Sequence, residues 1–114
     1  MIEKILIDYL SEALDVPVYA ESPEEAEDSY VLVEKTGGGE AEYISTATVA
    51  IQSYARSSML DAILLNAEVK SAMREAVTLN SISSVQLNSD YNFTDETKKI
   101  YRYQAVYSVV WFDD

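Results

Sequence analysis

The sequence predicts a single α+β domain in which two helices pack on an antiparallel or mixed sheet of about four to five strands. Two patterns carry this prediction. Apolar residues recur at helical spacing in two separate segments, and the segments between and after them are rich in β-branched and aromatic residues. The chain has 114 residues, of which 48% are apolar, so one core and one domain over residues 1–114 are expected. The predicted order is α-β-β-β-α-β-β.

The first predicted helix covers Ile2–Leu14, with polar residues on its opposite face. Its apolar stripe consists of Ile2, Ile5, Leu6, Tyr9, Leu10, Ala13 and Leu14. The helix must end before Pro17, because the residue preceding a proline avoids the helical conformation. Val16–Tyr19 then predicts a short strand, and Pro17 places it at a sheet edge because proline cannot donate to a ladder.

An acidic segment follows around Pro23, and we expect it to be a solvated connection because its like charges repel one another. Its acids are Glu21, Glu24, Glu25, Glu27 and Asp28.

Two further strands are predicted to form a long hairpin over Tyr30–Thr36 and residues 42–55. Gly37, Gly38 and Gly39 separate them, and because glycine tolerates positive φ we expect a loose turn with a flexible tip at Gly37–Glu42. The second of these strands is apolar on both faces, which is typical of a central strand covered on both sides.

The second predicted helix starts at Ser57 or Ser58, either of which can cap it, and runs to about Val77. Asp61 suits the positive end of this helix. The helix is expected to lie across the sheet. Its apolar stripe comprises Met59, Ala62, Ile63, Asn66, Val69, Met73 and Val77, widened by Leu60, Leu64 and Ala67.

The C-terminal third predicts a weakly alternating strand over residues 82–91, a polar connection over Asn88–Lys99 and a last strand over Ile100–Phe112. Alternate residues of the last strand share one face: Tyr101, Tyr103, Ala105, Tyr107, Val109 and Trp111.

The residue types present exclude several kinds of catalysis. The chain contains neither cysteine nor histidine, which removes Ser–His–Asp and Cys–His mechanisms and the commonest metal ligand. The glycine run lacks the Gly-Lys-Ser/Thr ending of a phosphate loop, and Glu40 follows it directly. We therefore expect no enzyme activity, no catalytic residues, no metal and no cofactor. The N-terminal sequence predicts no signal peptide, and no apolar stretch predicts a membrane helix.

The net charge of −12, from 20 acids against 8 bases, opposes a grip on DNA phosphates. Two interpretations stay open at this point. The charge serves solubility alone, or it lines a surface that DNA passes without sticking, in which case the acids from Glu21 to Asp28 are candidates for a lumen or a solvent face.

Nine tyrosines in one small chain also leave two interpretations open. Tyrosine suits the core and surface of a sheet, and it is equally enriched at subunit interfaces. The candidate interface residues are Gly37, Gly38, Gly39, Glu40, Tyr43, Tyr91, Phe93, Tyr101, Tyr103 and Tyr107.

Several segments, in order along nearly the whole chain, resemble the tail terminator (tail completion) family of siphophages and related prophages. They are Ile2–Leu14 with Val16–Tyr19, Tyr30–Gly38, Ala50–Ala55, Asn88–Asp95 and Arg102–Tyr107.

The resemblance implies a structural virion protein that forms a ring, typically a hexamer, on the head-proximal end of the tail tube. Such a ring ends tube polymerisation and meets the head–tail connector or stopper protein, while DNA passes through its lumen without specific binding. The protein would reside in the virion, and in the bacterial cytoplasm during assembly. The expected contacts are the last strand, the Gly37–Glu42 tip and the Asn88–Lys99 connection. Alternatives are another neck or head-closure protein, and an acidic DNA mimic that inhibits a host nucleic-acid-binding protein.

Overall fold

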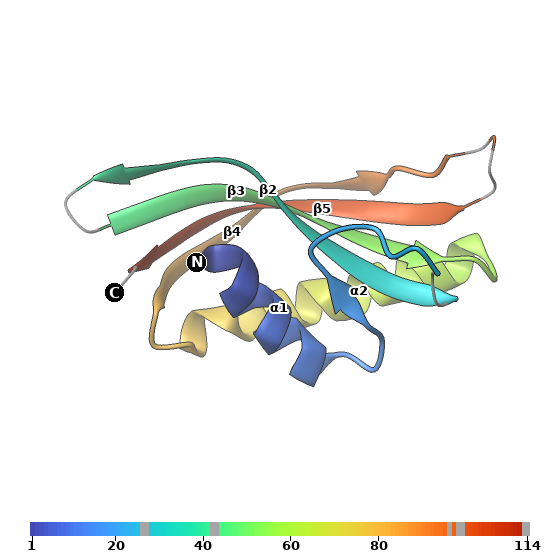
Figure 1. Cartoon of the computed structure of the whole chain (residues 1–114), viewed down its shortest axis with the longest axis horizontal. Helices are drawn as coiled ribbons and strands as arrows, with labels where there is room; N and C mark the ends of the chain where they lie inside the picture. Colours follow the sequence, from blue (N-terminus) through green and yellow to red (C-terminus); the bar gives the residue numbers. More distant parts are fainter. Residues whose placement is uncertain (26–27, 42–43, 96, 98–99, 113–114) are drawn as a thin grey trace.

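Both helices lie on the same side of one five-stranded sheet, as Figure 1 shows. The computed structural model describes residues 1–25, 28–41, 44–95, 97 and 100–112. The elements are α1 (Ile2–Ala13), β1 (Val18–Tyr19), β2 (Ser29–Ala41), β3 (Ile44–Ala55), α2 (Met59–Glu75), the 3-10 helix η1 (Ala76–Thr78), β4 (Ile82–Asn92) and β5 (Tyr101–Phe112). The predicted fold class and element order are confirmed.

The strand order in the sheet is β1-β2-β3-β5-β4. β1 is parallel to β2, whereas the β2–β3, β3–β5 and β5–β4 pairs are antiparallel, so the sheet is mixed. The short strand after Pro17 lies at an edge, as predicted, and the Pro17 carbonyl accepts a hydrogen bond from the Val31 amide at 2.9 Å. β3 is the central strand.

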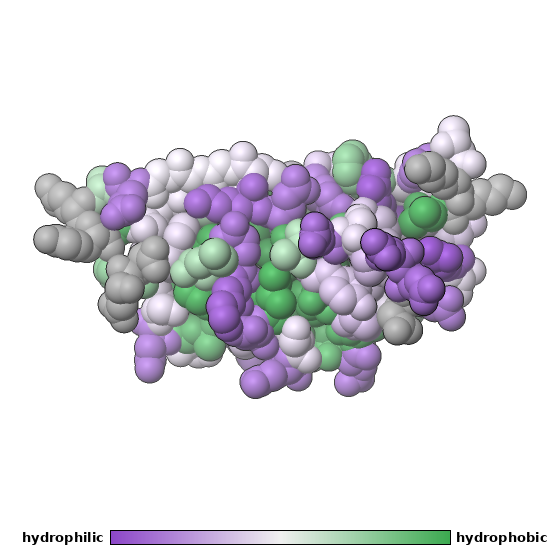
Figure 2. Space-filling model, viewed as in Figure 1, coloured by the Kyte–Doolittle hydropathy of each residue, from purple (hydrophilic) through white to green (hydrophobic). Residues whose placement is uncertain are grey.

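The main core fills the space between the helices and the sheet. Figure 2 shows apolar side chains there, flanked by hydrophilic ones. Helical spacing brings a buried stripe from each helix onto the sheet, and the helical core residues are Ile2, Leu6, Leu10, Ala62, Leu65, Val69 and Met73. The sheet supplies alternate residues: Val31, Val33, Val49, Ile51, Ala105, Tyr107 and Val109. The Tyr9 hydroxyl donates to the Ala72 carbonyl at 2.7 Å and so ties α1 to α2.

The start of α2 is as predicted, because the Ser58 side chain accepts a hydrogen bond from the Asp61 amide at 3.1 Å. The α-helix ends at Glu75 and continues as one 3-10 turn. The prediction that Leu60 and Leu64 widen the buried stripe is wrong, since these side chains are 62% and 54% exposed. They lie on the part of the helix surface that faces away from the sheet.

The predicted turn at the glycine run is also wrong. Gly37, Gly38 and Gly39 lie inside β2, paired with Thr48, Ala47 and Thr46, and the pairing continues to Ala41 and Ile44. None of the three glycines adopts a left-handed backbone conformation.

Steric crowding between the two strands explains why residue 38 is glycine. A Cβ atom there would lie 2.7 Å from the Thr46 carbonyl oxygen, so only glycine fits this approach of the two strands. One extra residue, Thr36, bulges out just before the run. Tyr43, predicted to be at the tip, lies outside the described residues.

The face of the sheet opposite the helices, which we call the outer face, is covered much less than predicted. A second, small cluster of Tyr30, Leu32 and Tyr54 buries β3 on this face only towards its C-terminal end. Part of the predicted connection over Asn88–Lys99 is in fact strand, because β4 extends to Asn92.

We predict that Gly38→Ala lowers the free energy of unfolding by about 1–3 kcal/mol, because the added carbon overlaps the Thr46 carbonyl. Gly37→Ala is the matched control. A Cβ atom at Gly37 meets nothing within 4 Å, so this change should be neutral or stabilise by up to about 1 kcal/mol. Urea unfolding of both variants checks the difference, and equal stabilities would contradict the close approach.

Candidate interaction surfaces

A chain of hydrogen bonds on the outer face runs from β5 to β3, back to β5 and on to β4. The strand register places Tyr54 opposite Arg102, and places Gln52, Gln104 and Tyr91 in the adjacent row. Arg102 Nη1 donates to the Tyr54 hydroxyl at 2.8 Å, and that hydroxyl donates to Gln52 Oε1 at 2.7 Å. Gln52 Nε2 donates to Gln104 Oε1 at 2.8 Å, and Gln104 Nε2 donates to the Tyr91 hydroxyl. The two buried glutamines are thereby satisfied without a covering helix.

Aromatic rings hold the cationic end of this network. The Arg102 guanidinium lies 4.2 Å from the centre of the Phe93 ring and 5.6 Å from that of Tyr54. Tyr54 stacks on Tyr30 with the ring centres 4.5 Å apart and the planes 8° apart. Tyr19 lies 6.1 Å beyond Tyr30, centre to centre. Tyr19, Tyr30, Tyr54, Arg102 and Phe93 therefore form a continuous row of side chains from the edge strand β1 to the segment after β4.

A cavity of about 300 Å³ opens beside this row. Its lining residues are Ser22, Pro23, Glu24, Tyr30, Tyr54, Arg56, Asp95, Ile100 and Arg102. Burial raises the pKa of Tyr30, and the neighbouring Tyr54 adds to that rise, whereas Arg56 and Arg102 oppose it. Both guanidinium groups thus lie within electrostatic reach of one phenol. We call this cavity the arginine–tyrosine pocket.

The aromatic residues predicted to lie at an interface differ in their exposure to solvent. Tyr91 and Phe93 are 40% and 41% exposed and meet edge to face, with their ring centres 5.9 Å apart. Tyr101 and Tyr103 are half-buried on the helix side of β5. Tyr107 is only 3% exposed and packs in the main core, so its predicted place at an interface is wrong and the core interpretation holds for it.

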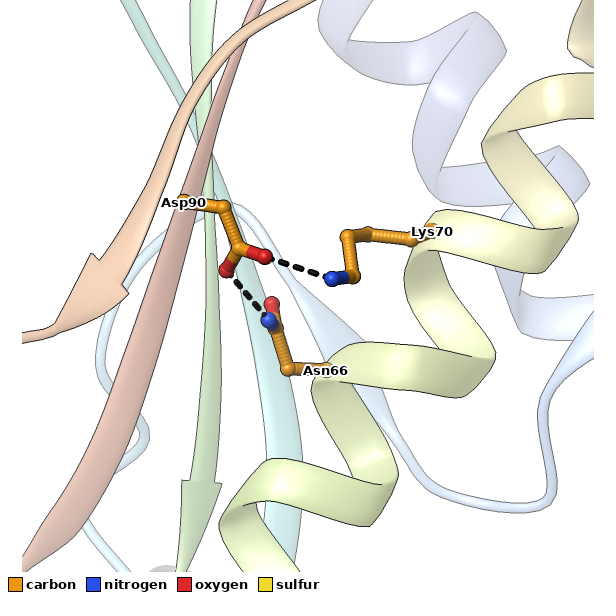
Figure 3. A network of polar contacts seen from close by, with 3 residues as sticks. All are labelled: Asn66, Lys70 and Asp90. Atoms are coloured by element: carbon orange, nitrogen blue, oxygen red, sulfur yellow. Dashed lines mark hydrogen bonds and ion pairs between the residues drawn. The ribbon is translucent and has the colours of Figure 1, made fainter.

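A polar cluster that the sequence did not reveal joins α2 to β4 (Figure 3). Asn66 Nδ2 donates to Asp90 Oδ1 at 2.6 Å, and Lys70 Nζ lies 2.5 Å from Asp90 Oδ2. Asn66 is buried, and the Lys70 and Asp90 side chains are 27% and 26% exposed. A polar residue within an apolar helical stripe was the one available signal. Its partner lies 24 positions away in the chain, so no local pattern connects the two.

The acidic segment before β2 is exposed, as predicted, at Glu21, Glu24, Glu25 and Asp28, whereas Glu27 lies outside the described residues. Among the described residues, no group of three or more acidic side chains is placed to hold a metal ion. No helix in that part of the chain is long and apolar enough to cross a membrane.

Comparison with known proteins gives no assignment, because neither a protein-family model nor a curated protein matches this chain. The function is therefore argued from the sequence and the surfaces described above.

We predict that Tyr107→Phe removes part of the alkaline instability of the fold. Burial, and to a lesser extent the Asp90 carboxylate, raises the pKa of Tyr107 to about 12, while Arg74 opposes the rise. The folded-state pKa lies above the unfolded value of about 10. The stability that the buried, protonated phenol contributes is therefore fully present below pH ~10 and is lost as the pH rises towards ~12. Between pH 9 and pH 11 the wild type should lose ~1 kcal/mol more than the variant. Urea unfolding across this range measures the loss, and parallel pH profiles would contradict the prediction.

We also predict that Lys70→Met lowers the free energy of unfolding by about 1–2 kcal/mol, because it leaves the partly buried Asp90 carboxylate with a single partner. Lys4→Met is the matched control. Lys4 pairs with Asp8 on the surface, where the side chains are 74% and 64% exposed, so its loss should change stability by less than about 0.5 kcal/mol. Equal effects in thermal and urea unfolding would show that the α2–β4 cluster contributes no more than a surface pair.

Proposed function

We propose that this chain is a structural phage protein that caps the head-proximal end of the tail tube as an oligomeric ring and joins the tail to the head. The main support for the ring is that, among the described residues, most of β2 on its outer side and all of the far side of β4 lack a partner strand. The sequence segments that resemble tail terminators, in the same order along the chain, support the position of this ring at the end of a tail tube.

The first open edge belongs to β2. Its partner β1 pairs only with Val31 and Leu32, so the stretch from Val33 to Ala41 has no strand on that side among the described residues. The glycine run lies within this stretch, and glycine inside a strand often marks a place where another backbone approaches closely. Gly38 is explained by its close approach to Thr46, but no described residue lies within 4 Å of the Cβ position of Gly37.

The second open edge is β4, whose residues are mostly exposed. Natural edge strands are usually protected from pairing by lysine, proline or inward-pointing charge. β4 contains no lysine, arginine or proline, and its single acid, Asp90, is bound by Asn66 and Lys70. Its protection is limited to bulges at Ser83 and Asn88. This strand is therefore suited to pairing with another chain.

Pairing of the β2 edge of one copy with the β4 edge of the next joins two different surfaces of identical subunits. Such a heterologous contact closes into a ring when the rotation between copies allows it. Tyr91, at the exposed end of β4, lies beside such a contact. The proposed partners are further copies of the chain, the tail tube protein and the head–tail connector or stopper protein.

The acidic surface fits a ring through which DNA passes. With 20 acids against 8 bases, the surface repels phosphates and gives no basic stripe for DNA to bind. In this proposal the chain acts by shape and contact, without catalysis, and resides in the virion after assembly in the bacterial cytoplasm.

Native mass spectrometry of edge variants tests the proposed ring. Ser84→Lys places a charge on the open β4 edge and should weaken self-association about fivefold, at about 1 kcal/mol per contact. Ser71→Lys, on the exposed surface of α2, adds the same charge and should leave association unchanged. Equal behaviour of the two variants would exclude the β4 edge as the contact.

The acidic-mimic alternative predicts a different outcome in host lysate. A mimic should retain a basic host protein on an affinity column, and salt should release it. The tail protein should retain none and should instead associate with tail tubes.

A further inference from the structure

Two arginines of the arginine–tyrosine pocket have no carboxylate partner among the residues that the structure describes, although acids outnumber bases by 20 to 8 in the sequence. Arg56 is exposed, and its side chain makes no hydrogen bond or ion pair with any described residue. Within the described part of the chain, the Arg102 side chain contacts neutral groups, namely the Phe93 carbonyl, the Tyr54 hydroxyl and two aromatic rings. Other cations of the chain do pair with acids, as Lys4 does with Asp8 and Lys70 with Asp90.

The Arg102 side chain is held in one orientation by its neighbours. Its guanidinium lies against the Phe93 ring and near the Tyr54 ring, and hydrogen bonds from Nε and Nη1 fix its orientation. A guanidinium has five N–H groups, so three stay available. A planar, oriented guanidinium suits the two oxygens of a carboxylate, because it can donate two parallel hydrogen bonds to them.

We propose that the arginine–tyrosine pocket binds a carboxylate side chain from an acidic segment of a protein partner. Arg102 would receive the carboxylate, Arg56 would add a second positive charge at the rim, and the stacked Tyr30 and Tyr54 rings would form an apolar wall. This site lies at the opposite end of β3 from the glycine run and goes beyond the proposed ring contact, because it concerns what docks on that end of the sheet.

The surroundings favour a carboxylate over the backbone of a nucleic acid. Glu24 and Asp95 also line the pocket, and the chain as a whole carries a charge of −12. A polyanion with a charge at every nucleotide would meet these acids repeatedly, whereas a single inserted carboxylate need not. The Asp95 carboxylate is already engaged, since its Oδ1 accepts hydrogen bonds from the Thr97 amide and hydroxyl. Glu24 is therefore the carboxylate of the pocket lining that competes with the ligand for the two arginines.

Titration with acetylated tetraglutamate, followed by NMR of the backbone amides, tests this proposal. Saturable shifts should appear around Tyr54 and Arg102 at millimolar peptide. Arg56→Ala should weaken binding about tenfold, and it should fold normally because the side chain is exposed and makes no hydrogen bond or ion pair with a described residue. The matched control is Arg74→Ala, which removes the same charge from exposed α2 and should leave binding unchanged. Glu24→Gln should strengthen binding, because it removes the competing carboxylate.

Three results would overturn the proposal. They are an absence of saturable shifts in the wild type, an equal loss of binding in the Arg56→Ala and Arg74→Ala variants, and tighter binding of a thymidylate oligonucleotide than of the peptide at the same salt concentration. The last result would make the pocket a phosphate site.

Discussion

The antiparallel pairing of β3 with β5 is the interaction on which the rest of the structure depends. It runs without a register shift from Ile44 opposite Phe112 to Ala55 opposite Tyr101, and it joins the N-terminal hairpin to the C-terminal strand. Because side chains alternate between the two faces, this one register decides which residues face the helices and which form rows on the outer face. A slip of β5 by one residue would place Arg102 under the helices and turn the core residue Val109 to the outer face.

The one-sided cover of the sheet explains the chemistry of the outer face. Without helices there, the glutamines of β3 and β5 bond one another and the hydroxyls of Tyr54 and Tyr91. Among the described residues, the Arg102 side chain is held by two rings, the Tyr54 hydroxyl and the Phe93 carbonyl, with no acidic side chain paired to it. The open edges have a similar origin: β1 is too short to cover β2, and no described residue pairs with the far side of β4. In the described part of the chain, two strand edges have no partner strand and one guanidinium has no acidic partner, and these features support the proposal that the domain contacts other chains.

Local chemistry made much of the fold predictable, and non-local contacts account for the errors. The Ser58 cap, the α1 stripe and the edge position after Pro17 depend on neighbouring residues, so the sequence alone indicated them. The glycine run was misread because glycine is equally compatible with a turn and with a crowded strand pair, and the crowding at Gly38 comes from Thr46. The pairing of Asp90 with Asn66 and the clamp around Arg102 likewise require the sheet register, which no periodicity reveals.

Electron microscopy of tail tubes polymerised in the presence of this chain tests the proposed function most directly. The proposal predicts tubes that stop growing and carry a closed ring of this chain at one end only. Tubes of unchanged length with no density added at either end, at protein concentrations that saturate any binding, would contradict it.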